Sequence, residues 1–348
     1  MKKKISKNLV QFIFLTIFLI LLTGCSISST ALNSNKKEFK IAHVTQETHI
    51  WHQASVKFGE ELEKLSEGRF TVNLYPSSQL GQEKDYMLLL ETGALDAAIL
   101  TNGYMSTREE SLNAWFLPFT FPTIEEAIAM TETEESQALL ETLNKQGVKG
   151  LGFIFAGNRH ILLSDDFVHS PDDLDGKKVR ILGSPIMQMF WEHLGAGPTA
   201  MPLSEVYTAL QTGVIDGMDI DLDALMTEKY YETADHLTIT NHMTFPALFV
   251  ISKRVYNELS KTDQAIVDEA AKRAIAWANE ETIKRETETL KKLKDAGVNV
   301  TEIEDFSPFL DAKEHVINTY TKKNELIKRF VEKANQLRGE KVEYNKGT

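Results

Sequence analysis

The chain has 348 residues, of which 42% are hydrophobic and 25% are charged, and its formal net charge is −12. This composition suits two ordinary globular domains and excludes a disordered or fibrous protein. The acidic balance argues against nucleic-acid binding, which needs a basic face. On so acidic a chain, an anion site must draw its attraction from nearby arginines and helix N-termini.

The N-terminus has the pattern of an export signal. Several lysines precede an apolar run over residues 9–22, which is short for a membrane span and typical of a secretory signal peptide. The run leads into Leu22-Thr23-Gly24-Cys25, which resembles a bacterial lipobox. The alternative is a free cysteine in an ordinary signal peptide. We predict a signal peptide over residues 1–24, lipidation of Cys25 and a flexible, polar tether over residues 25–38.

The remaining sequence alternates strand and helix patterns, which implies an α/β fold with crossover connections. Strands are expected at residues 39–44, 70–75, 96–100, 151–155 and 179–181. Helices are expected at residues 51–66, 83–91, 184–194 and 204–211. We expect Ser204 to cap the last of these helices and Gly213 to end it.

A long helical pattern begins at Ser260 with a capping-box sequence and ends at Gly297. A helix of this length would measure roughly 54 Å, longer than one domain is wide. The alternatives are a solvated coiled coil and a spine that crosses two domains. The apolar face fades after Ile283, which argues against the coiled coil. A strand at residues 298–300 and two C-terminal helices are expected to follow.

Arg180 lies between Val179 and Ile181 in a strand pattern, so its side chain points toward a buried layer. A guanidinium is always charged and matches a carboxylate with two parallel hydrogen bonds. A buried guanidinium needs a negatively charged partner, which either a bound organic acid or an internal ion pair with Asp or Glu would supply. The residue type alone leaves both alternatives open.

Four titratable residues near the first strand could suggest a metal site: His43, Glu47, His49 and His52. A zinc site needs three or four converging ligands, and helical spacing is absent between His43 and His49. The alternative is a loop between strand and helix in which Trp51 packs or stacks. Because Cys25 is the only cysteine, cysteine-based metal sites and nucleophiles are excluded after it. We expect no metal and no other cofactor.

Residues 202–217 carry the most specific motif, PLSEVYTALQTGVIDG. This segment closely resembles P-x-S-E-V-Y-T-A-L-Q-T-G-V-x-D-G of the DctP-like, C4-dicarboxylate-binding family, the solute-binding proteins of tripartite ATP-independent periplasmic (TRAP) transporters. The segments at residues 79–83, 93–96, 117–119, 236–240 and 247–252 resemble further signatures of that family. The resemblance therefore covers nearly all of the chain after the signal peptide.

The resemblance implies a two-lobed, periplasmic-binding-protein-like fold with a long helix spanning both lobes. Lobe I would comprise residues 39–157 and 247–283, and lobe II residues 158–246 and 284–340. The implied protein is an extracytoplasmic lipoprotein, anchored to the outer face of the cell membrane. It would act as a monomer that captures a small organic acid, either a sugar acid or a C4-dicarboxylate. Its macromolecular partners would be the integral-membrane TRAP permease subunits.

The resemblance also implies that Arg180 clamps the ligand carboxylate and that Arg159 makes a second contact. For Arg159, the alternative is an ion pair with an acid such as Asp165. At position 220 the family usually has an amide side chain that bonds the ligand, whereas this chain has Ile220. Either the ligand therefore lacks the polar group that the amide would contact, or a neighbouring acid makes that contact. A carboxylate in this place would repel an anionic ligand unless it contacted hydroxyl groups of that ligand. The full set of expected ligand-binding residues is Arg180, Arg159, Asn158, Ser184, Asp219, Trp51, His52, Glu83 and Asn102.

Two other functions are compatible with the same exported scaffold, an enzyme and a receptor. An enzyme such as a hydrolase would need a catalytic motif, and neither G-x-S-x-G, H-E-x-x-H nor a P-loop occurs. We therefore expect binding without catalysis. A ligand-sensing receptor that feeds a sensor kinase remains the alternative, because the sequence does not separate sensing from transport.

Overall fold

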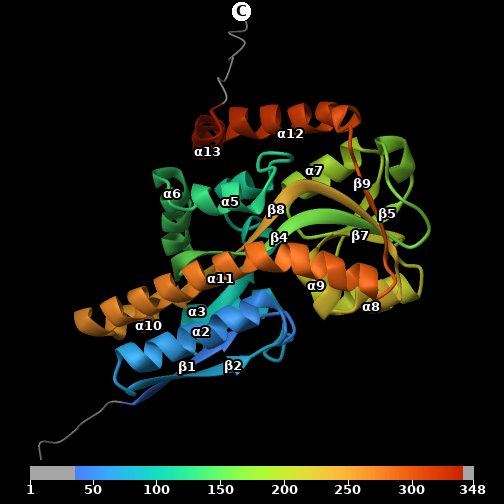
Figure 1. The fold of residues 1–348 in the computed structure, drawn as a ribbon. Coiled ribbons are helices and arrows are strands. Elements are labelled where there is room, and N and C mark those ends of the chain that lie inside the picture. Colours follow the sequence, from blue (N-terminus) through green and yellow to red (C-terminus); the bar gives the residue numbers. More distant parts are fainter. Residues whose placement is uncertain (1–35, 340–348) are drawn as a thin grey trace, which may run out of the picture. The chain divides into compact units, whose positions relative to one another are not determined.

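The computed structural model describes residues 36–339 (Figure 1). The predicted signal peptide, Cys25 and nearly all of the predicted tether lie outside the described residues. Within the described range, none of the helices combines the length and apolar character that a membrane span requires.

A mixed sheet organises the fold of the described residues. In the order of the sheet its main path runs β2, β1, β3, β8, β4, β7, β5 and β6, and β9 pairs separately with β8. The strands are β1 (Lys37–Ala42), β2 (Phe70–Tyr75), β3 (Ala97–Thr101), β4 (Val148–Leu163), β5 (Lys178–Ile181), β6 (Gly197–Ala200), β7 (Gly217–Asp221), β8 (His236–Ser252) and β9 (Asn299–Glu302). The expected strands at residues 39–44, 70–75, 96–100 and 179–181 are confirmed.

The two central strands are much longer than the sequence patterns indicated. β4 has 16 residues and β8 has 17, and they pair antiparallel from Val148 opposite Ser252 to Leu163 opposite His236. The expected strand at 151–155 is only part of β4, and the two segments at 236–240 and 247–252 belong to one strand. Because these two strands pair along their whole length at the centre of the sheet, residues 37–339 form one compact unit.

Helices cover the two faces of the sheet (Figure 1). They are α2 (Ile50–Leu65), α3 (Glu83–Thr92), α4 (Asn102–Met105), α5 (Ile124–Met130), α6 (Glu134–Thr142), α7 (Pro185–His193), α8 (Leu203–Gln211), α9 (Leu222–Thr227), α10 (Lys253–Glu258), α11 (Lys261–Asp295), α12 (Leu310–Lys323) and α13 (Glu325–Leu337). The expectation for the start of α8 was wrong. The cap position is Pro202, in an extended conformation with no side-chain cap, and the hydroxyl of Ser204 instead accepts a hydrogen bond from Gln82 Nε2 at 3.0 Å.

The helix α11 is the long spine expected from the sequence. Its first turn is capped by Ser260, whose hydroxyl accepts a hydrogen bond from the Asp263 N–H at 3.1 Å. Its 35 residues correspond to a length of about 52 Å. The helix packs against α2, β4 and α9, as Figure 1 shows in orange. These contacts exclude the solvated coiled coil.

Polar side chains of α11 hold the middle of β4. Asn279 donates to the Phe153 carbonyl and accepts from the Phe155 N–H, both at 3.1 Å. Farther along the helix, the Glu286 carboxyl accepts a hydrogen bond from the Asn158 N–H at 2.7 Å. The register of β4 against β8 shifts between Phe155 and Asn158. The helix thus satisfies backbone groups of β4 before Arg159, where β4 has no pairing with β7.

Candidate ligand-binding site

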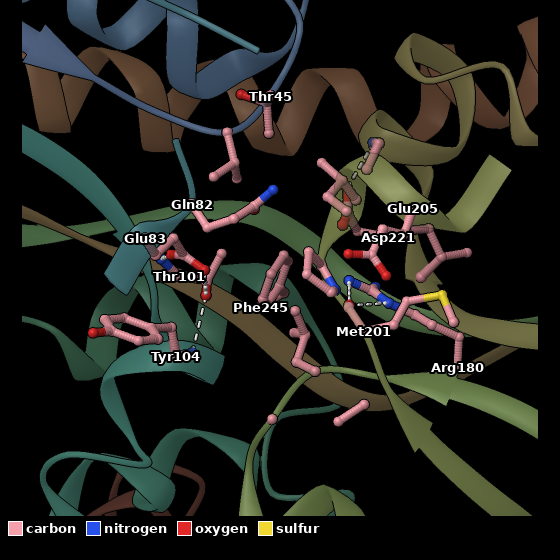
Figure 2. Close-up of a pocket in the computed structure, with 18 of the residues that line it drawn as sticks. Thr45, Gln82, Glu83, Thr101, Tyr104, Arg180, Met201, Glu205, Asp221 and Phe245 are labelled. Carbon is pink, nitrogen blue, oxygen red and sulfur yellow. Dashed lines mark hydrogen bonds between the residues drawn. The ribbon is translucent and has the colours of Figure 1, made fainter. Parts of the chain in front are cut away.

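A cavity of about 370 Å³ lies where the ends of several strands meet (Figure 2). This volume is in the usual range for a small-molecule site. Its lining comes from the β1–α2 loop, the start of α3, the β3–α4 junction, β4, β5, the segment before α8, the β7–α9 junction and β8. Elements far apart in the sequence therefore converge on one cavity.

Arg180 enters this cavity from β5 and is almost fully buried. Its Nε and Nη2 atoms donate to the Met201 carbonyl at 3.1 and 2.9 Å. Among the described residues, the structure pairs it with no carboxylate, and its Nη1 group makes no hydrogen bond. Burial lowers the pKa of Arg180 to about 10, so the side chain stays charged at neutral pH. The expected alternative of an internal ion pair is therefore not what the structure shows for this residue.

Arg159 also lines the cavity, but its guanidinium is fully engaged by acids of β7. It lies directly opposite Asp221 in the pairing of β4 with β7. Its Nε donates to Asp219 at 2.6 Å, its Nη2 also contacts Asp219, and its Nη1 donates to Asp221 at 3.3 Å. Asp165, the partner considered in the sequence analysis, instead pairs with Lys177. Arg159 thus forms an internal ion pair, with partners other than the expected one.

The two acids beside Arg159 have different electrostatic surroundings. Burial would raise the pKa of Asp219, but the charges of Arg159 and His242 outweigh it and hold that pKa below its usual value. Its second oxygen lies 2.7 Å from His242 Nε2. For Asp221, burial dominates and raises the pKa, and one oxygen caps α9 by accepting from the Ala224 N–H at 2.8 Å. The carboxylate of Asp219 is therefore the firm counter-charge of Arg159.

The opposite wall of the cavity carries Glu83, next to Thr101 and Tyr104 (Figure 2). Glu83 accepts hydrogen bonds from the Thr101 N–H at 2.5 Å and from its hydroxyl at 3.0 Å. Burial raises the pKa of Glu83 to about 7, although Thr101 and the charge of Arg180 pull it down. This wall thus offers a carboxyl group that can either donate or accept a hydrogen bond near neutral pH.

Aromatic rings form another part of the wall. Trp51 packs between His49 and Phe245, with ring centroids 4.9 and 5.3 Å away. The indole Nε1 of Trp51 and the Nε2 of His49 are buried and find no hydrogen-bond partner among the described residues. The Nε2 of His49 lies 3.7 Å from an oxygen of Asp223, within ion-pair distance. The indole N–H of Trp51 has no such contact in the described part of the chain, and because buried polar atoms without a partner are rare, its place beside the cavity suits a ligand that accepts its hydrogen bond.

The histidines of the β1–α2 loop serve internal contacts. His43 Nε2 lies 3.0 Å from His52 Nδ1, and burial lowers the pKa of His43 to about 3. The Nδ1 of His49 accepts from the Trp51 N–H and caps α2. Across residues 36–339, no group of three or more His, Cys, Asp or Glu side chains is arranged to hold a metal ion.

The structure brings together four of the nine expected ligand-binding residues: Arg180, Arg159, Trp51 and Glu83 line the cavity. The other five, Asn158, Ser184, Asp219, His52 and Asn102, are not part of its lining. Ser184 caps α7 and contacts Asn113, Asn102 donates to the Leu112 carbonyl, and Asn158 contacts Asn241. The lining residues that the sequence analysis missed include Gln82, Tyr104, Glu205 and Phe245. Gln82 adjoins Glu83 within a recognised signature, whereas Tyr104 and Phe245 carry no local signal.

Residues 41–324 match the bacterial extracellular solute-binding proteins, family 7, also named DctP. The chain belongs to this family. A C4-dicarboxylate-binding periplasmic protein DctP of Shewanella loihica is 30% identical, over 74% of this chain and 76% of its own. A sialic acid-binding periplasmic protein SiaP of Vibrio cholerae is also 30% identical, over 76% of this chain and 82% of its own.

Solved structures of family 7 proteins share the fold. A TRAP periplasmic solute-binding protein of a Bradyrhizobium species, in complex with galacturonate, has a TM-score of 0.82 and 30% identity, and the match covers 86% of this chain and 100% of that one. A second, from Roseobacter denitrificans with bound β-D-glucuronate, has a TM-score of 0.81 and 25% identity, with coverage of 86% and 99%. The expected two-lobed binding-protein fold with a long helix is confirmed, and the chain is an extracytoplasmic solute-binding protein of the TRAP type.

Proposed function

We propose that this family 7 protein captures a small organic acid, either a sugar acid or a C4-dicarboxylate, and delivers it to an integral-membrane TRAP permease. The observation that carries this proposal is Arg180, a buried cation that lines the cavity without an acidic partner among the described residues. A buried charge needs a counter-charge, and a ligand carboxylate would supply it with two parallel hydrogen bonds. Binding proteins for uronates, sialic acid and C4-dicarboxylates among its relatives support the same class of ligand.

The other cavity residues have secondary roles in this proposal. Glu83 meets hydroxyl groups of the ligand from the opposite wall, and Trp51 offers its indole N–H and an apolar ring face. Arg159 contributes less than Arg180 because its charge is already compensated. Catalysis is not part of the proposal, because binding and release alone account for these side chains.

We also propose that the ligand is enclosed by movement of two lobes, residues 39–157 with 247–283 and residues 158–246 with 284–340. Hydrogen bonds between these segments support a closed arrangement. Gln82 Nε2 donates to Ser204 Oγ at 3.0 Å, and Gln46 Nε2 donates to Glu228 Oε2 at 3.3 Å. Closure that excludes water strengthens the pairing of a carboxylate with Arg180.

The proposed location is the outer face of the cell membrane, with Cys25 as a lipid anchor and the protein acting as a monomer. A thermal-shift screen of organic acids tests the binding function, because a ligand that binds only the folded state raises the melting temperature. Sugar acids or C4-dicarboxylates should raise it, and isothermal titration should then give one ligand per protein. Absence of a shift with every acid would contradict the proposal. Recovery of a chemically altered ligand would show an enzyme instead.

A further inference from the structure

The two arginines of the cavity differ in how much of their charge is available to a ligand. Arg180 contacts only the neutral carbonyl of Met201. Arg159, in contrast, donates three hydrogen bonds to the carboxylates of Asp219 and Asp221 and a fourth to the backbone carbonyl of Asp219, and both acids are fully buried. The positive charge of Arg159 is therefore neutralised inside the protein. A ligand meets one uncompensated cation, although two guanidinium groups line the wall.

The remaining charged groups add no second anion site. Glu83 faces the cavity from the wall opposite Arg180 (Figure 2). Lys84 and Glu205 lie at the exposed part of the lining and carry opposite charges. The far end of a ligand clamped by Arg180 thus lies among carboxyl groups. A second carboxylate there would be repelled, whereas hydroxyl groups could donate hydrogen bonds to the carboxyl oxygens.

The side chain at position 220 agrees with this picture. Ile220 belongs to the lining of the cavity. Successive side chains of a strand face opposite sides, so the Ile220 side chain points away from Asp219 and Asp221 and packs in the core cluster that contains Leu162 and Met218. This side chain therefore gives a ligand no polar contact that could offset the repulsion of a second charge.

We infer that internal neutralisation of Arg159 by Asp219 and Asp221 makes this site selective for monocarboxylates with hydrogen-bond donors and unfavourable for dicarboxylates of the same size. This inference rests on the proposed binding function and narrows its ligand class. It assigns selectivity to Asp221, which lines the cavity, rather than to the arginine that holds the carboxylate. Asp221 thus determines which acid binds, whereas Arg180 is the main source of affinity.

The test uses pairs of acids that share a carbon skeleton and differ in one terminal carboxylate. Suitable probes are D-galacturonate with galactarate, D-gluconate with D-glucarate, and D-3-hydroxybutyrate with L-malate. Isothermal titration gives the ratio of the two dissociation constants within each pair. For the full-length protein we expect the monocarboxylate to bind at least about tenfold more tightly in each pair that binds, as like-charge repulsion in a buried site requires.

Three variants test whether acidic side chains of the cavity cause this ratio of dissociation constants. Asp221→Asn removes the charge and keeps an oxygen that can cap α9. It should lower the preference for the monocarboxylate about tenfold. Glu83→Gln, on the opposite wall, should also lower the preference for the monocarboxylate. It replaces Asp221→Asn as the test if that variant does not fold. Asp165→Asn removes an equal charge at an exposed acid that does not line the cavity and should leave the ratio unchanged.

The outcomes separate this inference from the function on which it rests. Equal or tighter binding of the dicarboxylates by the unmodified protein would overturn the inference and leave the binding function intact. An unchanged ratio in both Asp221→Asn and Glu83→Gln would also overturn it, because the acids would then not be the cause. If none of the six acids binds while another acid raises the melting temperature in the thermal-shift screen, the inference fails and the binding function stands. If no acid in the screen raises it, the proposed function fails.

Discussion

Arg180 donates two hydrogen bonds to the carbonyl oxygen of Met201, at 3.1 and 2.9 Å, from Nε and Nη2. This carbonyl fixes the plane of the guanidinium without neutralising it. The Nη1 group keeps its donors for another partner. The side chain is thus oriented before a ligand enters, which reduces the entropy lost on binding.

Replacement of Arg180 should therefore weaken binding far more than folding. In Arg180→Ala, a ligand carboxylate would be buried without its partner, which costs about 2–5 kcal/mol, or roughly 30- to several-thousand-fold in affinity. Arg180→Lys keeps the charge but loses the planar fork, so it should restore only part of the affinity. Isothermal titration measures both variants. Normal affinity together with a lowered melting temperature of the ligand-free Ala variant would instead indicate a structural role.

Gly217 should be required for the packing of β7 against β4. An ideal Cβ at this position would lie 2.3 Å from the Leu162 carbonyl oxygen and 3.0 Å from the Leu163 Cα. Gly217→Ala should therefore lower the free energy of unfolding by about 1–3 kcal/mol, as overpacking of a close contact does. Gly197→Ala, where the Cβ meets the Lys177 carbonyl at an ordinary 3.6 Å, is the matched control. Urea unfolding of the two variants should separate them, and equal stabilities would contradict the predicted close contact.

Glu286 should make stability depend on pH in a defined direction. Burial raises the pKa of Glu286 from 4.5 to about 7, helped by the charges of Asp221 and Glu125. Between these two values the unfolded chain loses the proton while the folded protein keeps it, so this group's contribution to stability falls as pH rises. Above about pH 7 both states are ionised and the contribution becomes constant.

Glu286→Gln tests this dependence, because the amide oxygen can still accept the Asn158 N–H. Relative to the unmodified protein, the melting temperature of the variant should rise as the pH increases from about 5 to about 8. Glu288→Gln, at an exposed position on the same helix, is the control for loss of one negative charge. A difference between Glu286→Gln and the unmodified protein that does not change with pH would contradict the raised pKa.

Cys25 is predicted to be lipidated, although it lies outside the described residues. Cys25→Ser should release the protein from the membrane fraction, because a single acyl-bearing residue would have been its anchor. Ser26→Ala leaves the cysteine in place and should remain membrane-bound. Fractionation of cells followed by immunodetection measures both, and unchanged retention of the Cys25 variant would exclude the anchor.

The ligand is expected to stabilise the closed arrangement of the two proposed lobes. Small-angle scattering should show a smaller radius of gyration when an acid identified in the thermal-shift screen is present at saturation. The hydrogen bond between Gln82 and Ser204 joins these lobes. In Gln82→Ala, the ligand-free protein should therefore be at least as expanded as the unmodified protein. An unchanged radius with and without ligand would contradict hinge closure.

Local patterns in the sequence were enough to predict much of the scaffold. The strand around Arg180 was predicted by apolar alternation, and the start of α11 was predicted by the serine at position 260. Both signals act within a few residues, so no knowledge of distant segments was needed. The same holds for most helix positions, whereas the start of α8 was missed because Pro202 occupies the cap position in place of a side-chain acceptor.

Long-range pairing explains what the sequence did not reveal. Arg159 meets Asp221 only through the register of β4 against β7, and neighbouring residues carry no signal for that register. The length of β4 was also hidden, because a glycine directly after an apolar run is typical of the end of a strand. In the structure, Gly157 adopts φ 135° at a register shift and the strand continues beyond it. The choice between Asp165 and the β7 acids as partners of Arg159 could be made only in three dimensions.

The pairing of β3 with β8 has a consequence for the order in which the protein forms during export. Ala97 pairs with Ile251, so the strands nearest the N-terminus find their central neighbour only when a far later part of the chain is available. Contacts this distant in sequence form slowly, because the intervening chain must first be brought together. The wall that carries Glu83 is therefore joined to the wall that carries Arg180 only when β8 is complete. A chain that stops before Ser252 should have no ligand affinity at all, instead of a weakened form of it.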